Sequence, residues 1–332
     1  MGMNEFIEPF ERMIETIATP ALVRAVEHGM DAASLWDVVA ASGFLDALVP
    51  EDRGGAGLSP AQVHPLWLAL GRHAVPLPIG ETMIARYLLA MAGADLPDGP
   101  IFLAEARTGA ECVISGGLLA RHALVEADGA LHLVETASMA PAPTGVNGSL
   151  AARVSWSGPT RAAIGAAPAG GLRSLGAILN AARIAGAAAR LTGMATAYAN
   201  ERIQFGKPIG RQQALQQTLA VMAEDMVAAR IASQLGCAGG LPPSPAAAAT
   251  AKSVASAAAA RITATAHAVF GAIGISEEHD LQLFTRRLHE WRLADGAETF
   301  WNRRLGALRL AVEMGSVDFV RAWQDAGQDS SL

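Results

Sequence analysis

Two side chains in the second half of the sequence have the types and spacing to bind a nucleotide. Arg202 and Phe205 lie three residues apart, where a helical pattern gives way to a loop at Gly206 and Pro208. A guanidinium offers planar donors for a diphosphate, and a phenyl ring offers a face for stacking. The spacing alone also fits a surface arginine beside a core phenylalanine at a helix end.

A second candidate lies at the start of the last long helical pattern. Asp295 and Glu298 have the D-x-x-E spacing of a capping box, in which the first side chain accepts hydrogen bonds from the free amides of the helix. This pattern predicts Asp295 as a helix cap.

Composition excludes several classes of protein. The 332 residues are 51% hydrophobic and 17% charged, which predicts a packed globular chain and excludes a disordered one. The 25 basic residues are spread along the chain and the net charge is −6, so we expect no nucleic-acid partner. Cys112, Cys237 and the histidines show no metal-binding spacing, so we expect no metal.

We expect a cytoplasmic protein that makes no use of a membrane. The N-terminal residues lack the basic region and apolar run of a secretion signal. The Ala/Gly-rich stretches around 175–200 and 253–275 are interrupted by arginines, which is typical of buried helices and not of membrane spans. Phosphate-cradling glycine loops and a serine nucleophile elbow are missing from the sequence, so nucleotide and serine hydrolysis have no support.

Periodicity divides the chain into three regions. Apolar residues at three- and four-residue steps predict helices. They cover residues 6–18, 20–28, 32–42, 60–73, 79–91, 171–201, 212–235, 246–270, 280–291 and 297–326. Alternation predicts short strands at 123–126, 131–135 and 152–156. Asp128-Gly129 is a plausible hairpin turn between the first two.

The predicted fold is therefore mainly α with a small β domain. We expect an N-terminal helical domain over 1–95, a small β domain over 96–165, and a C-terminal four-helix bundle over 166–332. The apolar stripe from Leu215 to Ala229 should pack against another helix.

Three motifs resemble those of the acyl-CoA dehydrogenase family. Residues 201–209, followed by Gln213, resemble its ER-x-x-FG-K-x-I…Q signature. Residues 49–58 are similar to its P-E-x-x-G-G-x-G segment, and residues 270–277 to its Q-x-x-G-G-x-G-Y-x-x-E segment. The resemblance covers nearly the whole chain. It implies the family's fold and an FAD-dependent α,β-dehydrogenation of an acyl-CoA thioester.

The resemblance also implies which residues bind the cofactor. Arg202, Phe205 and Gln213 would contact the pyrophosphate and adenosine end of an FAD held by a neighbouring subunit. Gly271 and Gly274 would let the backbone approach the same cofactor, because glycine has no side chain in the way. A plain turn between helices is the alternative for these two glycines.

Asp295 stands where the family commonly carries its catalytic glutamate. That carboxylate removes the α-proton, and burial in a dry site raises its pKa and makes it a better base. Some members carry the base on the first helix of the C-terminal domain, but residues 171–200 contain no acidic residue. Aspartate is shorter than glutamate by about 1.5 Å. Asp295 can therefore serve as the base or as the helix cap.

Several family features are missing from this sequence. The β region lacks the T-E-P-x-x-G-S-D and W-I-T-N segments that hold the flavin ring and thioester. Ala268, Ala272 and Ala297 replace the family's glutamine, glycine and threonine. The pattern resembles the short subunits of heteromeric α2β2 acyl-CoA dehydrogenases from bacterial steroid side-chain catabolism, in which two different chains share each FAD site.

Three hypotheses follow about the working enzyme. The chain is a subunit that shares FAD with a second, motif-complete chain; or a self-sufficient homodimer or homotetramer using Asp295 as base; or a non-catalytic scaffold of the same fold. The expected ligands and partners are FAD, an acyl-CoA substrate, further subunits, and electron-transfer flavoprotein or a similar electron acceptor.

Overall fold

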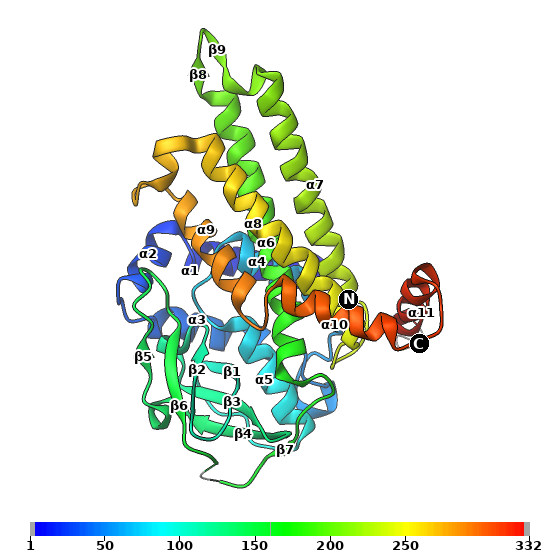
Figure 1. Ribbon diagram of the computed structural model, residues 1–332. Helices are drawn as coiled ribbons and strands as arrows, with labels where there is room; N and C mark the ends of the chain where they lie inside the picture. The colour runs from blue at the N-terminus through cyan, green and yellow to red at the C-terminus, as the bar shows by residue number, and fades with distance from the viewer. Residues whose placement is uncertain (1–3, 160, 329–332) are drawn as a thin grey trace.

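The computed structural model describes residues 4–159 and 161–328, and its chain starts with a helical region (Figure 1). Its helices are α1 (Asn4–Ile17), α2 (Pro20–Glu27), α3 (Ala33–Ala41), α4 (Pro60–Arg72) and α5 (Ile79–Met91). These bounds confirm the helices that periodicity predicts, to within a few residues. Ser59 begins α4 with a capping box: its Oγ accepts from the Gln62 amide at 3.3 Å, and Gln62 Oε1 accepts from the Ser59 amide at 2.8 Å.

Two small sheets form the middle region. The first has the order β1-β3-β4-β7, with strands Ile101–Glu105, His122–Ala127, Ala130–Glu135 and Gly165–Ala166. The second has the order β2-β6-β5, with strands Ala110–Ile114, Ala152–Trp156 and Ala142–Pro143. The strands expected from alternation are confirmed as β3, β4 and β6. Asp128 and Gly129 form the β3–β4 turn with φ of 50° and 77°, as their positive-φ tolerance predicts.

The sequence analysis missed β1 and β2. β1 pairs in parallel with β3, with Ile101 opposite His122, so its partner is not adjacent in sequence. Both strands are short and lie beside Gly and Pro residues, which hides their alternation. They matter for function because they form one wall of the cavity described below. The domain boundaries at residues 95 and 165 stay predictions.

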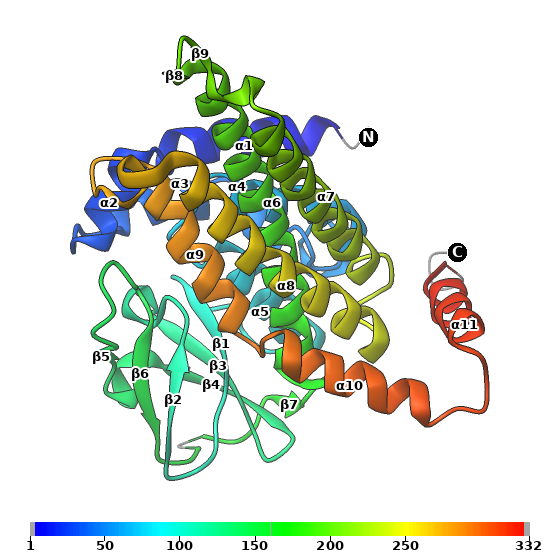
Figure 2. The same cartoon turned by 45° about the horizontal axis from the view of Figure 1, so that its top comes forward.

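Four long helices of the C-terminal region lie side by side (Figure 2). They are α6 (Gly171–Glu201), α7 (Gln213–Gly236), α8 (Pro245–Phe270) and α9 (Leu281–Leu293). The predicted stripe on α7 packs inward: Met222 and Ala229 are buried. The segment Pro245–Ile275 is long and apolar enough to cross a membrane by length and composition, but α8 packs against α6, α7, α9 and the following helix.

The predicted single helix from Ala297 to Ala326 is wrong. The chain forms α10 (Glu298–Leu310) and α11 (Ser316–Gln328), which projects away from the body of the molecule (Figure 1). Glycine has low helix propensity, and Gly315 lies in the break between them. Arg309 stabilises the turn by donating from Nε to Ser316 Oγ at 3.2 Å.

Close backbone contact fixes α6 against the N-terminal helices. A Cβ on Gly71 of α4 would lie 1.9 Å from the carbonyl oxygen of Arg183, and a Cβ on Gly186 of α6 would lie 1.9 Å from that of Leu68. Only glycine allows such an approach. One hydrophobic core therefore joins the two helical regions and makes α6 a rigid base for the site.

Candidate active site

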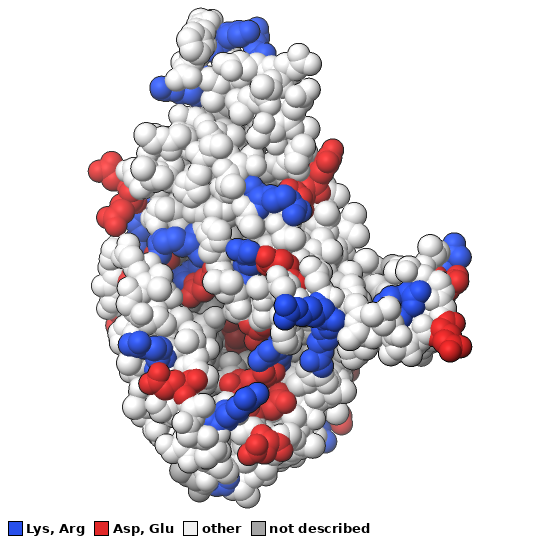
Figure 3. Space-filling view, viewed as in Figure 1, with Lys and Arg blue, Asp and Glu red and all other residues white. Residues whose placement is uncertain are grey.

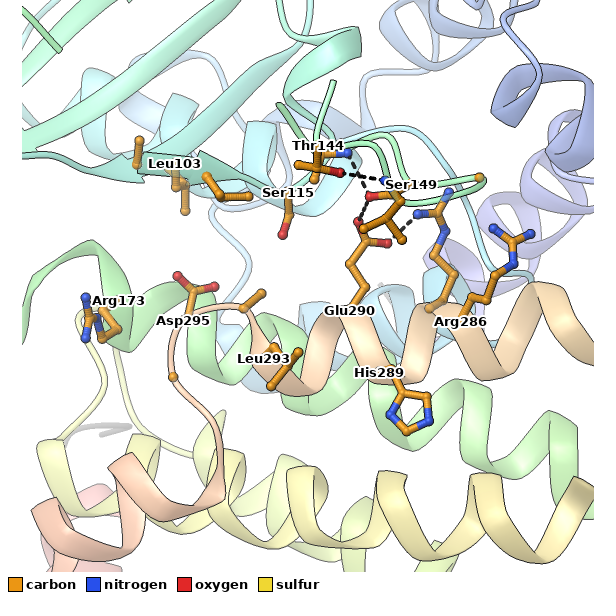
Figure 4. Close-up of a pocket in the computed structure, with 18 of the residues that line it drawn as sticks. Leu103, Ser115, Thr144, Ser149, Arg173, Arg286, His289, Glu290, Leu293 and Asp295 are labelled. Carbon is orange, nitrogen blue, oxygen red and sulfur yellow. Dashed lines mark hydrogen bonds and ion pairs between the residues drawn. The ribbon is translucent and has the colours of Figure 1, made fainter. Parts of the chain in front are cut away.

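A cavity of about 660 Å³ lies between the two sheets, α9 and the loop that joins α9 to α10 (Figure 4). Its apolar wall includes Leu103 of β1, Val113 of β2, and Leu293 at the end of α9. A smaller space of about 70 Å³ reaches inward to α6. Asp295 lines both spaces, so it stands where the cavity meets the helical core.

Asp295 is held in an unusual backbone conformation. Its φ is 55°, and that of the next residue, Gly296, is 94°. A non-glycine residue in the left-handed region carries strain that its surroundings must hold. Asn180 Nδ2 donates to Asp295 Oδ2 at 2.8 Å, and Trp301 Nε1 donates to the Asp295 carbonyl oxygen at 2.9 Å. The side chain points into the cavity, on the side where Ser115 faces it (Figure 4).

A glycine on α6 makes room for this carboxylate. A Cβ on Gly176 would lie 2.3 Å from Asp295 Oδ2, too close for any side chain. Gly176 and Asn180 lie four residues apart and therefore on the same face of α6. The carboxylate packs directly against the helix backbone between them, in a space that fits a short acidic side chain.

The prediction that Asp295 caps the last long helix is wrong. The N-cap of α10 is Ala297, and it makes no side-chain capping hydrogen bond. Asp295 lies two residues before that cap, and its carboxylate accepts from α6 instead. Glu298, the other member of the expected capping box, pairs with Arg292 at 2.5 Å. The tertiary contact with α6 has replaced the local one.

Burial controls the protonation of Asp295. Desolvation raises the pKa of Asp295 from 3.8 to about 6, while the positive charge of Lys252 acts in the opposite direction. The negative charges of Glu81 and Glu105 raise it further, and Arg173 lowers it. A carboxylate with a pKa near 6 is ionised at neutral pH and still has appreciable proton affinity, which suits a general base.

The other carboxylates around the cavity are engaged in ion pairs. Glu81 pairs with Arg183 at 2.5 Å in the core, and Glu105 pairs with Arg173 at 2.5 Å. Glu290 pairs with an arginine of its own helix and accepts from a serine hydroxyl at 3.0 Å. Within residues 4–159 and 161–328, Asp295 is the one acidic residue lining these spaces that has no ion-pair partner.

The predicted FAD-tail residues lie at the opposite end of the bundle. α6 ends at Glu201, and the hairpin of β8 (Ile203–Gln204) and β9 (Lys207–Pro208) follows. Phe205 at its tip is 91% exposed with φ of 52°. Arg202 and Gln213 are exposed as well, and in the described part of the chain Arg202 forms no ion pair. Basic side chains mark this end of the molecule in Figure 3.

The two predicted glycines differ from each other. Gly271 is exposed with φ of 60°, and a Cβ there would have no atom within 4 Å. Gly274 is buried, and its Cβ would lie 2.8 Å from Leu281 Cδ2, so packing inside this chain explains it. The ring of Phe270, next to Gly271, stacks on Tyr198 of α6 with centroids 4.4 Å apart. Gly271 therefore lies at the same end of the bundle as the hairpin.

The length of α6 separates the two groups of residues. Asn180, which holds Asp295, and Arg202 lie 22 residues apart along one helix, or about 33 Å at 1.5 Å per residue. Within one chain, Asp295 and the hairpin therefore lie far apart.

Sequence reasoning missed three residues of the Asp295 site: Gly176, Asn180 and Lys252. Gly176 and Asn180 lie in an Ala/Gly-rich helix with no motif around them. Lys252 carried a signal, because it is one of only two lysines in the sequence and lies in an alanine-rich apolar stretch. A long cation at such a position is rarely left buried without a partner.

Comparison with known proteins agrees with this architecture. Residues 170–309 match the family model described as "Acyl-CoA dehydrogenase, C-terminal domain". The chain is 32% identical over 297 residues to acyl-CoA dehydrogenase IpdE2 of Mycolicibacterium smegmatis, covering 85% of this chain and 90% of that one.

Two solved structures share the fold over nearly their whole length. The ChsE4-ChsE5 complex of Mycobacterium tuberculosis gives a TM-score of 0.78 at 22% identity, with 94% of this chain and 98% of that chain covered. A Tcur3481-Tcur3483 steroid ACAD gives a TM-score of 0.80 at 23% identity, with 93% of this chain and 99% of that chain covered. With the sequence relationship to IpdE2, these findings show that the chain belongs to the acyl-CoA dehydrogenase family.

Proposed function

We propose that this chain is a subunit of an FAD-dependent acyl-CoA dehydrogenase in which Asp295 is the catalytic base. The observation that carries the proposal is the unpaired carboxylate of Asp295, seated on α6 and facing the cavity. The Cα–H bond of the thioester breaks and its proton passes to Asp295. The Cβ–H bond breaks with its electron pair, and the Cα=Cβ double bond forms.

FAD is the proposed acceptor, and when bound it would supply the oxidising power for this reaction as an acceptor of hydride. The residues at the hairpin end fit its tail: Arg202 offers an exposed guanidinium, Phe205 an exposed ring, and Gly271 an open backbone. Because this end is about 33 Å from the Asn180 contact, these residues would reach the FAD of a neighbouring subunit. Gln213 belongs to the same exposed group, whereas Gly274 is accounted for by internal packing.

The substrate would enter the cavity with its acyl chain against the apolar wall. Leu103, Val113 and Leu293 offer a surface for hydrocarbon, and the volume of about 660 Å³ has room for a bulky acyl group. A steroid-derived acyl-CoA is our proposed substrate class, in line with the description of one structural neighbour as a steroid ACAD.

A second, different subunit is proposed to complete the enzyme. The family segments that hold the flavin ring are missing from this chain, and one structural neighbour is a complex of two named chains. The assembly would be an α2β2 tetramer in the cytoplasm, and electron-transfer flavoprotein or a similar protein would reoxidise it.

The test begins with visible spectra of the chain purified alone and co-expressed with a motif-complete acyl-CoA dehydrogenase subunit from a neighbouring gene. We expect a yellow complex that bleaches when the acyl-CoA is added. Asp295→Asn should keep the colour and slow bleaching by about 10³-fold, because general-base catalysis contributes about 10² to 10⁴. The exposed Asp37 supplies the control, Asp37→Asn, which should bleach at the normal rate.

Other outcomes would assign a different role. A chain that is yellow alone and bleaches without a partner is a self-sufficient homo-oligomer using Asp295. A complex whose FAD content and turnover are unchanged by Arg202→Ala and Asp295→Asn contains this chain only as a scaffold. Bleaching of the Asp295→Asn complex at the wild-type rate overturns the assignment of the base.

A further inference from the structure

Lys252 is a cation in the centre of the C-terminal helices. Its side chain is fully buried. The ammonium donates to the carbonyl oxygens of Trp291 at 2.6 Å and Arg292 at 2.9 Å, and to Ser256 Oγ at 3.2 Å. An ammonium has three N–H donors, so each of them has a partner.

The two carbonyls belong to the last turn of α9. The final carbonyls of a helix have no partner within the helix, and the helix dipole makes this end attractive to a cation. Lys252 on α8 therefore closes the end of α9 with both hydrogen bonds and charge. Asp295 follows two residues after the last residue of α9, so Lys252 fixes the point from which its loop departs.

Two further contacts hold the rest of this loop. The Arg292–Glu298 pair spans it from α9 to α10, and Trp301 holds the carbonyl of Asp295 from α10. Lys252 and Trp301 are the fully buried members of this set. Lys252 makes its contacts from outside the α9–α10 segment to the backbone that leads into Asp295, and Ser256 of the same helix also donates to the Arg292 carbonyl oxygen at 3.4 Å.

A buried cation of this kind is costly for the fold. In the described part of the chain Lys252 has no ion-pair partner, and a buried charge without one destabilises a protein. Burial lowers the pKa of Lys252 to about 7, with Asp295 and Glu298 acting to raise it and Arg292 to lower it. Apolar residues would fill this alanine-rich interior at no such cost, so the charge itself has a use.

We propose that Lys252 is a positioning residue for Asp295: its ammonium anchors the end of α9, holds the Asp295 loop against α6, and keeps the carboxylate ionised. This inference rests on the proposed function, because the ionised carboxylate is needed only if Asp295 accepts a proton. The charged groups acting on Asp295 from the surrounding elements are Lys252 of α8, Glu81 of α5, Glu105 of β1 and Arg173 of α6. Lys252 is the largest favourable charge among them.

The first experiment titrates Asp295 directly in the full-length chain. Aspartate labelled with ¹³C at Cγ gives a carboxyl NMR signal, and its absence from Asp295→Asn assigns it. We expect a midpoint near pH 6 in the unsubstituted chain. Lys252→Met should raise the midpoint by about 1 unit, because the positive charge that lowers the pKa of Asp295 is then removed.

Two variants separate charge from packing. The side chain of Lys252→Gln is neutral but still donates hydrogen bonds to the α9 carbonyls, so this variant should fold even if Lys252→Met does not. Because the positive charge is gone, the titration midpoint of Asp295 should still rise. Ser256→Ala removes a hydroxyl contact of the ammonium without removing the charge, and its midpoint should stay near that of the unsubstituted chain. An unchanged midpoint in Lys252→Gln overturns the proposal.

The second experiment uses the assembled enzyme with its partner subunit and acyl-CoA. Lys252→Gln should lower kcat by about fivefold at pH 6 with little change in KM, because a midpoint higher by about 1 unit leaves less of Asp295 ionised. It should move the acid limb of the pH–rate profile by the shift seen in the titration. If the titration shifts but Asp295→Asn leaves turnover intact, Lys252 still positions Asp295 while the proposed function fails. If Asp295→Asn abolishes turnover but Lys252→Gln moves neither the acid limb of the pH–rate profile nor the titration midpoint of Asp295, the proposed function stands. Only the proposed role of Lys252 then fails.

Discussion

The two ends of α6 carry functional candidates of opposite character. At the C-terminal end, Phe205 is 91% exposed on a hairpin and Arg202 is exposed as well. At the N-terminal half, Asp295 is seated on Gly176 and hydrogen-bonded to Asn180. The hairpin contributes little to the fold of its own chain, whereas the Asp295 site is built entirely by that chain.

This difference indicates how each end gains its function. Residues that lack partners in their own chain are available to another subunit, so the hairpin has its proposed function only in an assembly. The Asp295 site needs the packing of α5, α6, α8 and the sheets before its carboxylate has the right environment. Substitutions should therefore affect stability at one end and assembly or cofactor content at the other.

The largest effect on stability is expected at the buried ion pair between Glu81 and Arg183. Glu81→Gln leaves the guanidinium of Arg183 buried without its carboxylate, which should lower the free energy of unfolding by about 3 to 5 kcal/mol. Denaturant unfolding measures it. The control is Glu11→Gln, which breaks the more exposed Arg72–Glu11 pair and should cost about 0 to 1 kcal/mol. Equal losses in both variants would show that burial of the Glu81–Arg183 pair does not add to its effect on stability.

A smaller effect on stability is expected at Gly176, against which the carboxylate of Asp295 packs. Gly176→Ala places a methyl group where Asp295 Oδ2 lies 2.3 Å away, so it should destabilise the protein by about 1 to 3 kcal/mol and displace the base. Thermal unfolding and turnover of the assembled enzyme measure both effects.

Gly193 supplies a matched control for this change on the same helix. Its Cβ position has no atom within 4 Å, so Gly193→Ala should stabilise the protein by up to about 1 kcal/mol and leave turnover unchanged. Full turnover in Gly176→Ala would show that Asp295 does not need the space left by the missing side chain of Gly176.

At the hairpin end we expect loss of cofactor without loss of stability. Phe205→Ala should change the free energy of unfolding of the isolated chain by less than about 0.5 kcal/mol. The FAD affinity of the assembled enzyme should fall about tenfold, since stacking of a base on an aromatic ring contributes about 1 to 3 kcal/mol. Absorbance of bound flavin after dialysis measures it. Retention of FAD equal to that of the unsubstituted complex would contradict the proposed contact.

The smallest expected effect concerns the pH dependence of kcat/KM, which should depend on the Asp295 site and not on the hairpin. Burial raises the pKa of Asp295 to about 6, so this proposed base is mostly protonated below pH 6 and mostly ionised above it. The value of kcat/KM should fall about tenfold per unit below that midpoint. Arg202→Ala should lower cofactor content but leave the midpoint in place, because its site does not touch Asp295. A midpoint that moves with Arg202→Ala would couple the two ends.

Local patterns were sufficient for most helices and for the hairpin between β3 and β4. Caps such as Ser59 and the turn at Asp128 act over a few residues, so they can be recognised in the sequence. The parallel pairing of β1 with β3 depends on contact between segments that are not adjacent in sequence. Periodicity alone predicted one continuous helix where the structure has α10 and α11.

The sequence by itself determined the family, the order of helical and β regions, and the position of Asp295 in a motif. It left the role of that aspartate divided between cap and base, because D-x-x-E is a sound local capping signal. Only the tertiary structure decided against the cap: Gly176, Asn180 and Lys252 come from α6 and α8, far from Asp295 in sequence. The environment of a carboxylate is a sum over neighbours in space, and those neighbours meet only when the chain has folded.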